Sequence, residues 1–548
     1  MSSGKSVIII GSGLGGLECG VIMARHGFKV TVLEQDRQIG GCLQTFVRKG
    51  SDGRAHTFDT GFHYAGGLDE GQPLHTLFKY FGLSDLPWSR MDEDCFDEVS
   101  FIDNGQVRSY PLASGHENFV RKLSERFPGH ETELESYASA LKHIGGGLFD
   151  AFSPDSEMFV RLGQSASEFI DNTFSDARLR DVVCGSTMKM EQDRETLPLY
   201  VYAQVNNSFI DSSWRLGRDE KTGESGGALI INKLASQLRA FGGEILTGMK
   251  VNAIRVSEDG AVSCVEAGEG DSFRTFSADW VISDVHPAVT VGLIEDCRQV
   301  RKVFRNRVTS LKNTFGVFTA NIILKPGTLP YMNRNLYVHK GGTDLWRRPE
   351  SGTSSVMVHF YPPENPDGKF ADCIDLLSPM GWDEVSGWAD ASPGARGEDY
   401  EAVKQRKLEE CLDLVNARIP GIRECIDRVW LSTPATWNGY VSAPYGSAFG
   451  VAKESRGRQF HTDRFSDSAA PACHQCCFHV AIFRIACNLA SFFHSAKPLR
   501  AVSFPRTHPH VMNAVLVTPR SPCRFRLWPV NRRFLRGVLG DMNVKSGL

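Results

Sequence analysis

The chain of 548 residues has almost no net charge and lacks a long apolar run. Its 61 Lys and Arg stand against 64 Asp and Glu, so electrostatics give no reason to expect nucleic acid as a partner. No stretch reaches the roughly 18 apolar residues that a membrane-spanning helix needs. The N-terminus also lacks the charged and apolar regions of a secretory signal. The sequence therefore predicts a cytoplasmic protein and leaves peripheral contact with a membrane open.

The 14 cysteines lack the spacing of a disulfide framework. The run ACHQCC at 472–477 has no second ligand pair at zinc-finger spacing, so no metal site is predicted. Cys42 has no further cysteine before Cys95, which disfavours a redox-active disulfide at this position. We therefore expect reduced thiols without a metal centre.

Acidic residues are scarce in one part of the chain only. Residues 455–548 carry 14 Lys and Arg against 3 Asp and Glu, whereas residues 1–454 carry 47 against 61. Such a division between two parts of a chain needs its own explanation. The difference in charge marks residues 455–548 as a basic segment that is distinct from the acidic residues before it.

A dinucleotide-binding pattern begins at the first strand. The apolar, β-branched run Val7–Ile10 is typical of a buried parallel strand, and GSGLGG follows it. In the G-x-G-x-x-G pattern the first glycine makes a tight turn, the second lets the backbone approach a pyrophosphate, and the third lets the helix pack closely. The helix N-terminus adds free N–H groups for the phosphates. The predicted cofactor-binding residues here are Gly11, Ser12, Gly13, Leu14, Gly15 and Gly16.

A second strand, KVTVLE, ends at Glu34, whose carboxylate can accept hydrogen bonds from an adenosine ribose. Gly40 and Gly41 follow, and at this point the chain resembles the flavin-dependent amine oxidase and phytoene desaturase superfamily. The resemblance implies that this glycine pair closes over FAD, with Cys42 beside it. It also implies that Val251, in a later strand, offers its backbone to the adenine. FAD, rather than free NAD, is the expected cofactor.

Three further segments narrow the resemblance. HTFDTGFHYAGG at 56–67 is similar to a segment of retinol saturases, carotenoid isomerases and phytoene desaturases. RGEDYEAVKQRKLEECL at 396–412 and SAPYGSAFGV at 442–451 are similar to segments of retinol saturases. The resemblance covers roughly residues 7–451. It implies an FAD-dependent oxidoreductase that saturates, desaturates or isomerises carbon–carbon double bonds of a lipophilic isoprenoid such as retinol or a carotenoid. NAD(P)H is the candidate electron donor.

Residues beside the flavin follow from the same resemblance. Cys42 and Asp59 are expected near the cofactor. His63 and Tyr64 are the candidate catalytic residues, because either side chain can donate a proton when a double bond is saturated. The alternative for His63 is a structural hydrogen-bonding role, and for Cys42 a small packing residue.

The predicted fold is α/β: a two-domain Rossmann-like FAD-binding fold with a discontinuous α+β substrate domain. Segments 1–67 and 225–290 are assigned to the FAD domain, and segments 68–224 and 291–454 to the substrate domain. Helices are expected in ENFVRKLSERF, in ESYASALKHI and in the block that follows Gly226.

Beyond Glu454 the resemblance fails. Residues 511–541 hold only remnants of the segment that closes over FAD, and the expected Thr-Gly-Gln strand and last helix are missing. Our hypothesis for 455–548 is translation in a shifted frame; the rival is a genuine basic extension that binds anionic lipid. Two alternatives to the main function also stay open: a flavin amine oxidase, and a flavin-binding protein inactivated by its altered C-terminus.

Overall fold

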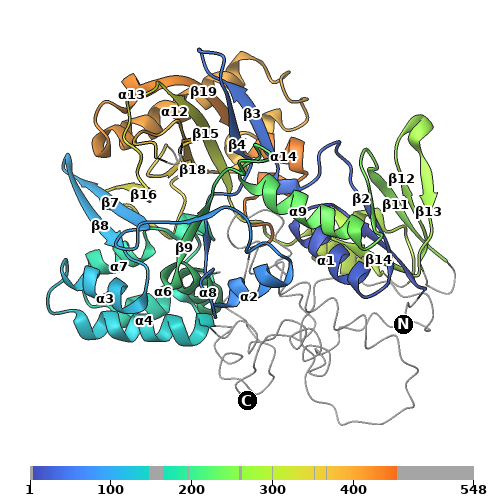
Figure 1. The fold of residues 1–548 in the computed structure, drawn as a ribbon, viewed down its shortest axis with the longest axis horizontal. Helices are drawn as coiled ribbons and strands as arrows, with labels where there is room; N and C mark the ends of the chain where they lie inside the picture. Colours follow the sequence, from blue (N-terminus) through green and yellow to red (C-terminus); the bar gives the residue numbers. More distant parts are fainter. Residues whose placement is uncertain are drawn as a thin grey trace, which may run out of the picture.

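The computed structural model describes residues 4–146, 164–194, 197–257, 262–298, 300–350, 352–365 and 367–452 (Figure 1). The cysteine cluster at 472–477 and the remnants predicted at 511–541 lie outside the described residues. Within them, no helix is both long enough and apolar enough to cross a membrane.

A four-stranded parallel sheet carries the glycine-rich loop, in the order β10–β2–β1–β14. Alternate residues of β1 serve two apolar cores. Val7 and Ile9 face helices α1 and α9, and Ile8 and Ile10 face a small antiparallel sheet. The strand is apolar throughout because both of its faces are covered. The elements are β1 (Ser6–Ile10), β2 (Lys29–Leu33), β10 (Glu244–Leu246), β14 (Trp280–Ser283), α1 (Leu14–Arg25) and α9 (Gly227–Ala240), and in the small sheet β11 (Val251–Val256), β12 (Val262–Ala267) and β13 (Arg274–Phe276).

A seven-stranded sheet forms the second part of the molecule, in the order β19–β15–β18–β17–β16–β7–β8. All neighbouring strands are antiparallel except β16 and β7, which are parallel. This pair joins the two separate segments of the chain that build the sheet. The bounds are β7 (Asp97–Asp103), β8 (Gln106–Leu112), β15 (Gly316–Leu324), β16 (Asn335–Lys340), β17 (Ser355–Phe360), β18 (Cys373–Met380) and β19 (Ile426–Ser432).

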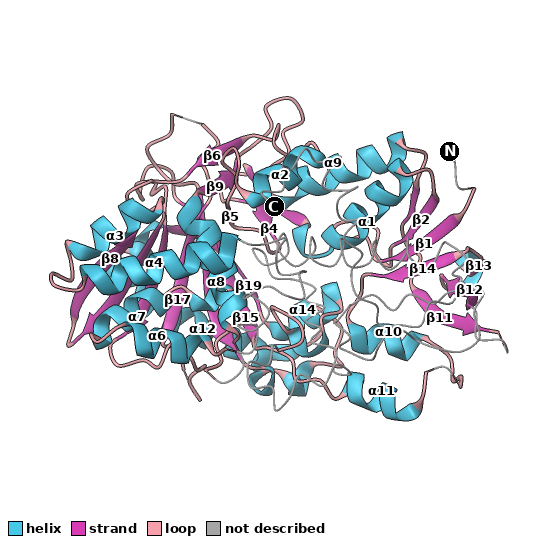
Figure 2. Cartoon of the chain, turned by 90° about the horizontal axis from the view of Figure 1, so that it is seen from below, coloured by secondary structure: helices cyan, strands magenta, loops and turns pink. Residues whose placement is uncertain are grey.

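Helices cover both faces of this sheet, which explains why β15, β17 and β18 are buried at every position. One face packs against α12 (Gly397–Arg418). The other faces a helical layer of α3 (His116–Ser124), α4 (Glu131–Gly146), α6 (Ala166–Thr173), α7 (Ala177–Cys184) and α8 (Leu199–Asp211) (Figure 2). The helices predicted in ENFVRKLSERF and in ESYASALKHI correspond to α3 and α4.

Shorter elements join the two parts. The hairpin of β3 (Thr45–Lys49) and β4 (Ala55–Asp59) leads from the glycine pair toward the seven-stranded sheet. Among the described residues, the other strands are β5 (Ala65–Gly66), β6 (Trp88–Arg90) and β9 (Ser213–Leu216), and the other α-helices are α2 (Pro73–Tyr80), α10 (Pro287–Leu293), α11 (Lys302–Thr309), α13 (Ile422–Cys425) and α14 (Pro434–Val441). A 3-10 turn, η1 (Gly41–Leu43), begins within the glycine pair.

The α/β fold class is confirmed. Leu74, Leu77 and Phe78 of α2 lie in the core beside the parallel sheet, and Val308 of α11 packs with the core around the small antiparallel sheet. The assignment of segments to two domains stays a prediction. The sequence pattern marks where helices begin, but not which core receives their apolar faces.

Candidate active site

The glycine-rich loop joins β1 to α1 at the carboxyl edge of the parallel sheet. Gly11 has φ of +97°, a left-handed turn that glycine adopts without strain. A Cβ on Gly16 would overlap the carbonyl oxygen of Gly11, so the third glycine is required for close packing of helix and strand. These are the physical roles that the sequence pattern predicts.

The first turn of α1 presents free backbone donors. The N–H groups of Gly13, Leu14 and Gly15 donate to no acceptor within the described part of the chain, as expected at a helix N-terminus. Such a turn also carries a partial positive charge. Together they form a cradle that suits the phosphates of a dinucleotide.

Asp284, which directly follows β14, lies under the same turn. Its Oδ2 accepts the N–H of Gly16 at 2.8 Å, and a Cβ on Gly15 would come within 2.7 Å of its Oδ1. Asp284 therefore satisfies one of the four orphan N–H groups of α1. The sequence offered one signal for it, an acid at the carboxyl end of a strand next to β1, but we did not predict it as a site residue.

Glu34 lies at the edge of the loop. Its Oε2 accepts hydrogen bonds from the backbone N–H of Ser12 at 2.9 Å and from Ser12 Oγ at 2.5 Å. The backbone N–H of Met249 donates to the Glu34 carbonyl oxygen at 2.7 Å, which brings the start of β11 at Val251 close by. The structure thus gathers the predicted ribose and adenine residues at one place.

The glycine pair closes over the loop. Gly40 donates its N–H to the Ser12 carbonyl oxygen at 3.1 Å, and a Cβ on Gly41 would lie 3.4 Å from the Cα of Gly13. Both glycines have positive φ. Cys42 follows in η1 and is partly buried. Residues that are 28 positions apart in sequence therefore approach each other through their backbones. Together with the glycine-rich loop and Glu34, the glycine pair forms a site that fits a dinucleotide.

Asp59 ends β4 and is buried against the start of α9. Its Oδ1 accepts the N–H of Gly227 at 2.6 Å, and a Cβ on Gly226 would overlap its carboxyl group. Burial raises the pKa of Asp59 well above its ordinary value. Its observed contact is therefore with the protein backbone, where it caps a helix from another element.

His63, predicted as catalytic, is buried in the loop between β4 and β5. Its Nδ1 lies 3.9 Å from Oδ2 of Asp375 in β18, and its ring centroid lies 4.8 Å from that of His359 in β17. Burial, and then the charge of Arg215, lower the pKa of His63 to about 3. The imidazole is therefore neutral at physiological pH.

Asp375 has an unusual environment for a carboxyl group. Tyr361 Oη donates to its Oδ2 at 2.6 Å and Asn321 Nδ2 donates to its Oδ1 at 2.7 Å. Burial nevertheless raises the pKa of Asp375 to about 7, against the lowering effect of these two hydrogen bonds. Below that pH the contact joins a neutral imidazole to a neutral carboxylic acid, so it is not an ion pair.

The same hydrogen-bond chain reaches the dinucleotide domain. Tyr361 Oη accepts the backbone N–H of Asp59 at 3.0 Å while it donates to Asp375. Since Asp59 in turn caps α9 at Gly227, the chain runs from the start of α9 to the middle of the seven-stranded sheet. His63 lies where the two parts of the molecule are joined.

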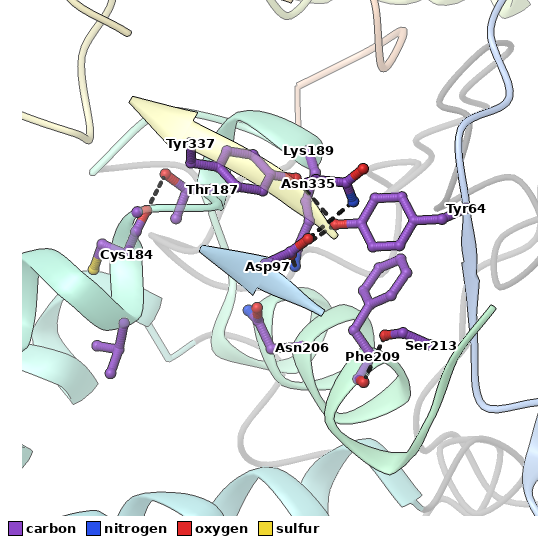
Figure 3. A network of polar contacts seen from close by, with 12 residues as sticks. Tyr64, Asp97, Cys184, Thr187, Lys189, Asn206, Phe209, Ser213, Asn335 and Tyr337 are labelled. Carbon is purple, nitrogen blue, oxygen red and sulfur yellow. Dashed lines mark hydrogen bonds and ion pairs between the residues drawn. The ribbon is translucent and has the colours of Figure 1, made fainter. Parts of the chain in front are cut away.

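Tyr64 points into a second buried network (Figure 3). Its hydroxyl donates to Asp97 Oδ2 at 2.8 Å and lies 3.0 Å from the hydroxyl of Tyr337. Lys189 Nζ lies 3.4 Å from the same Asp97 oxygen, and Asn335 donates to the other oxygen at 3.0 Å. Burial, and then the Asp97 charge, raise the pKa of Tyr64 well above its ordinary value, so the hydroxyl keeps its proton.

Comparisons with known proteins agree with this geometry. A family model described as an NAD(P)-binding Rossmann-like domain matches residues 9–81. The 4,4'-diapophytoene desaturase (4,4'-diapolycopene-forming) of a Methylomonas species is 38% identical over 474 residues, covering 82% of this chain and 86% of the desaturase. The chain belongs to the retinol saturase and phytoene desaturase family. The all-trans-retinol 13,14-reductase of Danio rerio is 23% identical, with 81% of this chain and 77% of the reductase covered.

A solved structure shares the overall fold of this chain. Putrescine oxidase bound to putrescine aligns with a TM-score of 0.55 at 13% identity, covering 90% of this chain and 100% of the oxidase. An identity this low shows a common fold and says nothing of amine chemistry in this chain. As a family member with this fold and this glycine loop, the chain is an oxidoreductase.

The network around Tyr64 gives a testable prediction about stability. Tyr64→Phe removes a buried donor and leaves an Asp97 oxygen with one partner fewer, which is expected to destabilise the fold by about 1–3 kcal/mol. The measurement is the thermal unfolding midpoint. Tyr110→Phe is the matched control, because Tyr110 is also buried and its hydroxyl makes no hydrogen bond to the described residues. An unchanged midpoint for Tyr64→Phe would contradict the structural role.

Proposed function

We propose that the chain is an FAD-dependent oxidoreductase that acts on carbon–carbon double bonds of a long conjugated isoprenoid. The observation that carries the proposal is the 38% identity to a 4,4'-diapophytoene desaturase across 82% of the chain. The similar relative named all-trans-retinol 13,14-reductase points to the same bond type. A flavin amine oxidase has less support: a likeness of fold, and 29% identity to an L-amino-acid oxidase of Mus musculus over 142 residues, 26% of this chain.

The residues that would hold FAD are those gathered at the loop. The N–H groups of Gly13, Leu14 and Gly15 would bind the phosphates, Glu34 the ribose, and Gly40 and Gly41 would lie over the cofactor. When bound, FAD supplies the two-electron redox chemistry. The protein contributes orientation, exclusion of water and control of protons.

The groups around His63 are the ones that would supply the proton in this proposal. Saturating a double bond adds a hydride equivalent and a proton, so the site needs a group that is protonated at working pH. His63, with a pKa of about 3, does not hold that proton, whereas Asp375, with a pKa of about 7, does. In this proposal Asp375 gives its proton to Nδ1 of His63 while Nε2 of the same ring gives its proton to the substrate carbon, after the two side chains close from 3.9 Å to hydrogen-bond distance. The predicted catalytic role of His63 thus becomes that of a relay.

Glu34→Gln tests the cofactor assignment without changing side-chain size. The amide keeps one acceptor oxygen but loses the charge, and hydrogen bonds to charged groups contribute about 1.5–3 kcal/mol. The dissociation constant for FAD is therefore expected to rise roughly 10- to 100-fold, measured by titrating apoprotein and following flavin fluorescence. Glu244→Gln is the control, because Glu244 lies on the neighbouring strand β10 and bonds only Thr31 among described residues. Equal affinities for wild type and Glu34→Gln would remove Glu34 from the site.

Reconstitution decides the function itself. Purified protein is loaded with FAD and tested in both directions: the oxidised protein is mixed with a carotenoid or putrescine, and protein reduced anaerobically with NADH or NADPH is mixed with all-trans-retinol or a carotenoid. Reduction of the flavin with formation of a desaturated isoprenoid, or reoxidation of the reduced flavin with formation of a saturated one, is the expected result; for the second direction this proposal takes NAD(P)H as the electron donor. Turnover of the amine alone would favour the amine oxidase. A yellow protein that reacts with none of these compounds would favour the inactivated flavoprotein, and a preparation that takes up no FAD would overturn the proposal.

A further inference from the structure

A row of five polar side chains crosses the middle of the seven-stranded sheet, where buried strands are normally apolar. The strand pairing places Asn321 opposite Asp375, Asp375 opposite His359, and Asn335 opposite Asp97. All five side chains are buried. A buried polar group costs free energy unless it is hydrogen-bonded, so the partners of each side chain indicate what the row does.

Arg215 of β9 fixes the orientation of the Asn335 amide. Its guanidinium is fully buried and donates to the Phe360 carbonyl oxygen at 2.6 Å and to Asn335 Oδ1 at 2.9 Å. A guanidinium only donates hydrogen bonds, so the amide atom that faces it must be the oxygen. The amide nitrogen of Asn335 then donates to Asp97 Oδ1 at 3.0 Å (Figure 3). The Asn335 amide therefore has one orientation.

The fixed amide determines where one hydrogen of His359 lies. Nδ1 of His359 is 3.2 Å from the same Asn335 oxygen. Since that oxygen can only accept a hydrogen bond, His359 must carry a hydrogen on Nδ1. This hydrogen bond holds the His359 ring in one orientation.

The anchored His359 ring lies between the two side chains that approach Asp375. Its centroid is 4.8 Å from that of His63 and 4.9 Å from that of Tyr361. His63 Nδ1 lies 3.9 Å from Asp375 Oδ2, and Tyr361 Oη donates to the same oxygen at 2.6 Å. The His359 ring therefore restricts the rotation of His63 and keeps its Nδ1 near Asp375.

We propose that His359 is a positioning residue for proton transfer from Asp375 through His63. No bond to His359 forms or breaks; its ring holds His63 in place while His63 and Asp375 close from 3.9 Å to hydrogen-bond distance. Arg215 and Asn335 act one step further back, because they fix the His359 ring. The inference rests on the proposed function, since it concerns the proton that saturates the double bond.

His359→Leu removes the ring that lies against His63. The rate at which an isoprenoid reoxidises the reduced flavin is expected to fall about 10- to 100-fold, because misplacing a reacting group by about 1 Å can cost about that factor. The dependence of the rate on substrate concentration should show unchanged substrate affinity. His359→Phe keeps an aromatic ring at this position and is expected to restore most of the rate. Stopped-flow absorbance gives both quantities.

His339→Leu is the matched control, because His339 is also a buried histidine of the same sheet, with its ring nitrogens bonded to Ser355 and to the Gly185 carbonyl oxygen. It is expected to lower the thermal unfolding midpoint, as His359→Leu does, without changing the rate. Unchanged rates in His359→Leu would overturn the proposal. So would equal losses in His359→Leu and His359→Phe, which would assign the effect to the ring nitrogens, or an equal loss in His339→Leu.

The position of the hydrogen on His359 is tested without turnover, on the FAD-loaded protein. The ring nitrogens of histidine are isotope-labelled, and the NMR signal that is lost in His359→Phe identifies His359. Its Nδ1 is expected to give the signal of a protonated nitrogen at neutral pH; an unprotonated Nδ1 would overturn the proposal even in a chain that acts on isoprenoids. A chain that acts on none would remove the proposed function whatever the NMR result, so the two failures are distinguishable. The NMR test needs only the wild-type fold and one variant, and so holds if His359→Leu does not fold.

Discussion

Gly16→Ala is expected to yield a protein that retains no FAD and has no measurable activity. The added Cβ would overlap the carbonyl oxygen of Gly11, a backbone atom that cannot rotate away. Either α1 must move from β1 or the turn at Gly11 must open, and overpacking of this kind costs about 1–3 kcal/mol, occasionally more. Because this turn also forms the phosphate-binding cradle, either movement would displace the free N–H groups of α1. The bound flavin after purification, measured by absorbance, should be lost.

Gly20→Ala is the control within the same helix. Its Cβ would lie 3.3 Å from a methyl group of Leu238, a flexible side chain, and alanine in a helix interior is favoured over glycine by about 1 kcal/mol. This variant is expected to retain flavin as wild type does. A yellow, active Gly16→Ala protein would show that the loop does not hold the cofactor as proposed. Loss of flavin in both variants would point to general damage to α1.

The cofactor half of the site was predictable because its signals are local. The order of strand, glycine loop, helix and acid is fixed by backbone geometry within one short segment, and the structure reproduces it from β1 to Glu34. The glycine pair was predictable by resemblance alone. Its backbone contact with Gly13 depends on how the chain returns after β2, which no local pattern states.

The other half of the site, around His63, is not marked by any pattern in the local sequence. His63 was a prediction from one segment, but its partners Asp375 and His359 stand far along the chain, in strands that look like ordinary buried strands. Arg215 is also hidden: its guanidinium is fully buried and bonds the Phe360 carbonyl oxygen and Asn335 Oδ1 at 2.6 and 2.9 Å. In sequence it reads as a surface arginine between apolar residues. Only the pairing of distant strands reveals these groups.

In the Asp375→Asn variant, the rate at which the reduced flavin saturates the isoprenoid double bond is expected to lose its dependence on pH near pH 7. In wild type the group must hold a proton, so the rate of reoxidation of reduced flavin by the isoprenoid should fall as pH rises through about 7. The amide cannot supply that proton, and loss of general acid catalysis typically costs about 10²–10⁴-fold. The rate should therefore drop by about that factor and become flat between pH 6 and pH 8, roughly the window around the raised pKa. Stopped-flow absorbance gives the profile.

Asp211→Asn is the matched control, because burial also raises the pKa of Asp211, to about 6, but its contacts are with Asn207 and His116. It should leave the profile unchanged. A profile for Asp375→Asn that follows wild type would exclude Asp375 as the proton-holding group.

Stability provides a second readout of the same carboxyl group, independent of turnover. Its pKa is raised in the folded state, so between the ordinary value near 3.9 and about 7 the folded chain binds more protons than the unfolded chain. The free energy of unfolding therefore falls as pH rises through this window, by up to about 1.4 kcal/mol per pH unit. The amide introduced by Asp375→Asn does not titrate and accepts through one oxygen only, so the variant loses this pH dependence together with one of the two hydrogen bonds from Tyr361 and Asn321. Its free energy of unfolding is therefore expected to change less with pH than that of wild type between about pH 4 and about pH 7. A slope equal to that of wild type, measured by denaturant unfolding across this window, would show that Asp375 is not the group that titrates there.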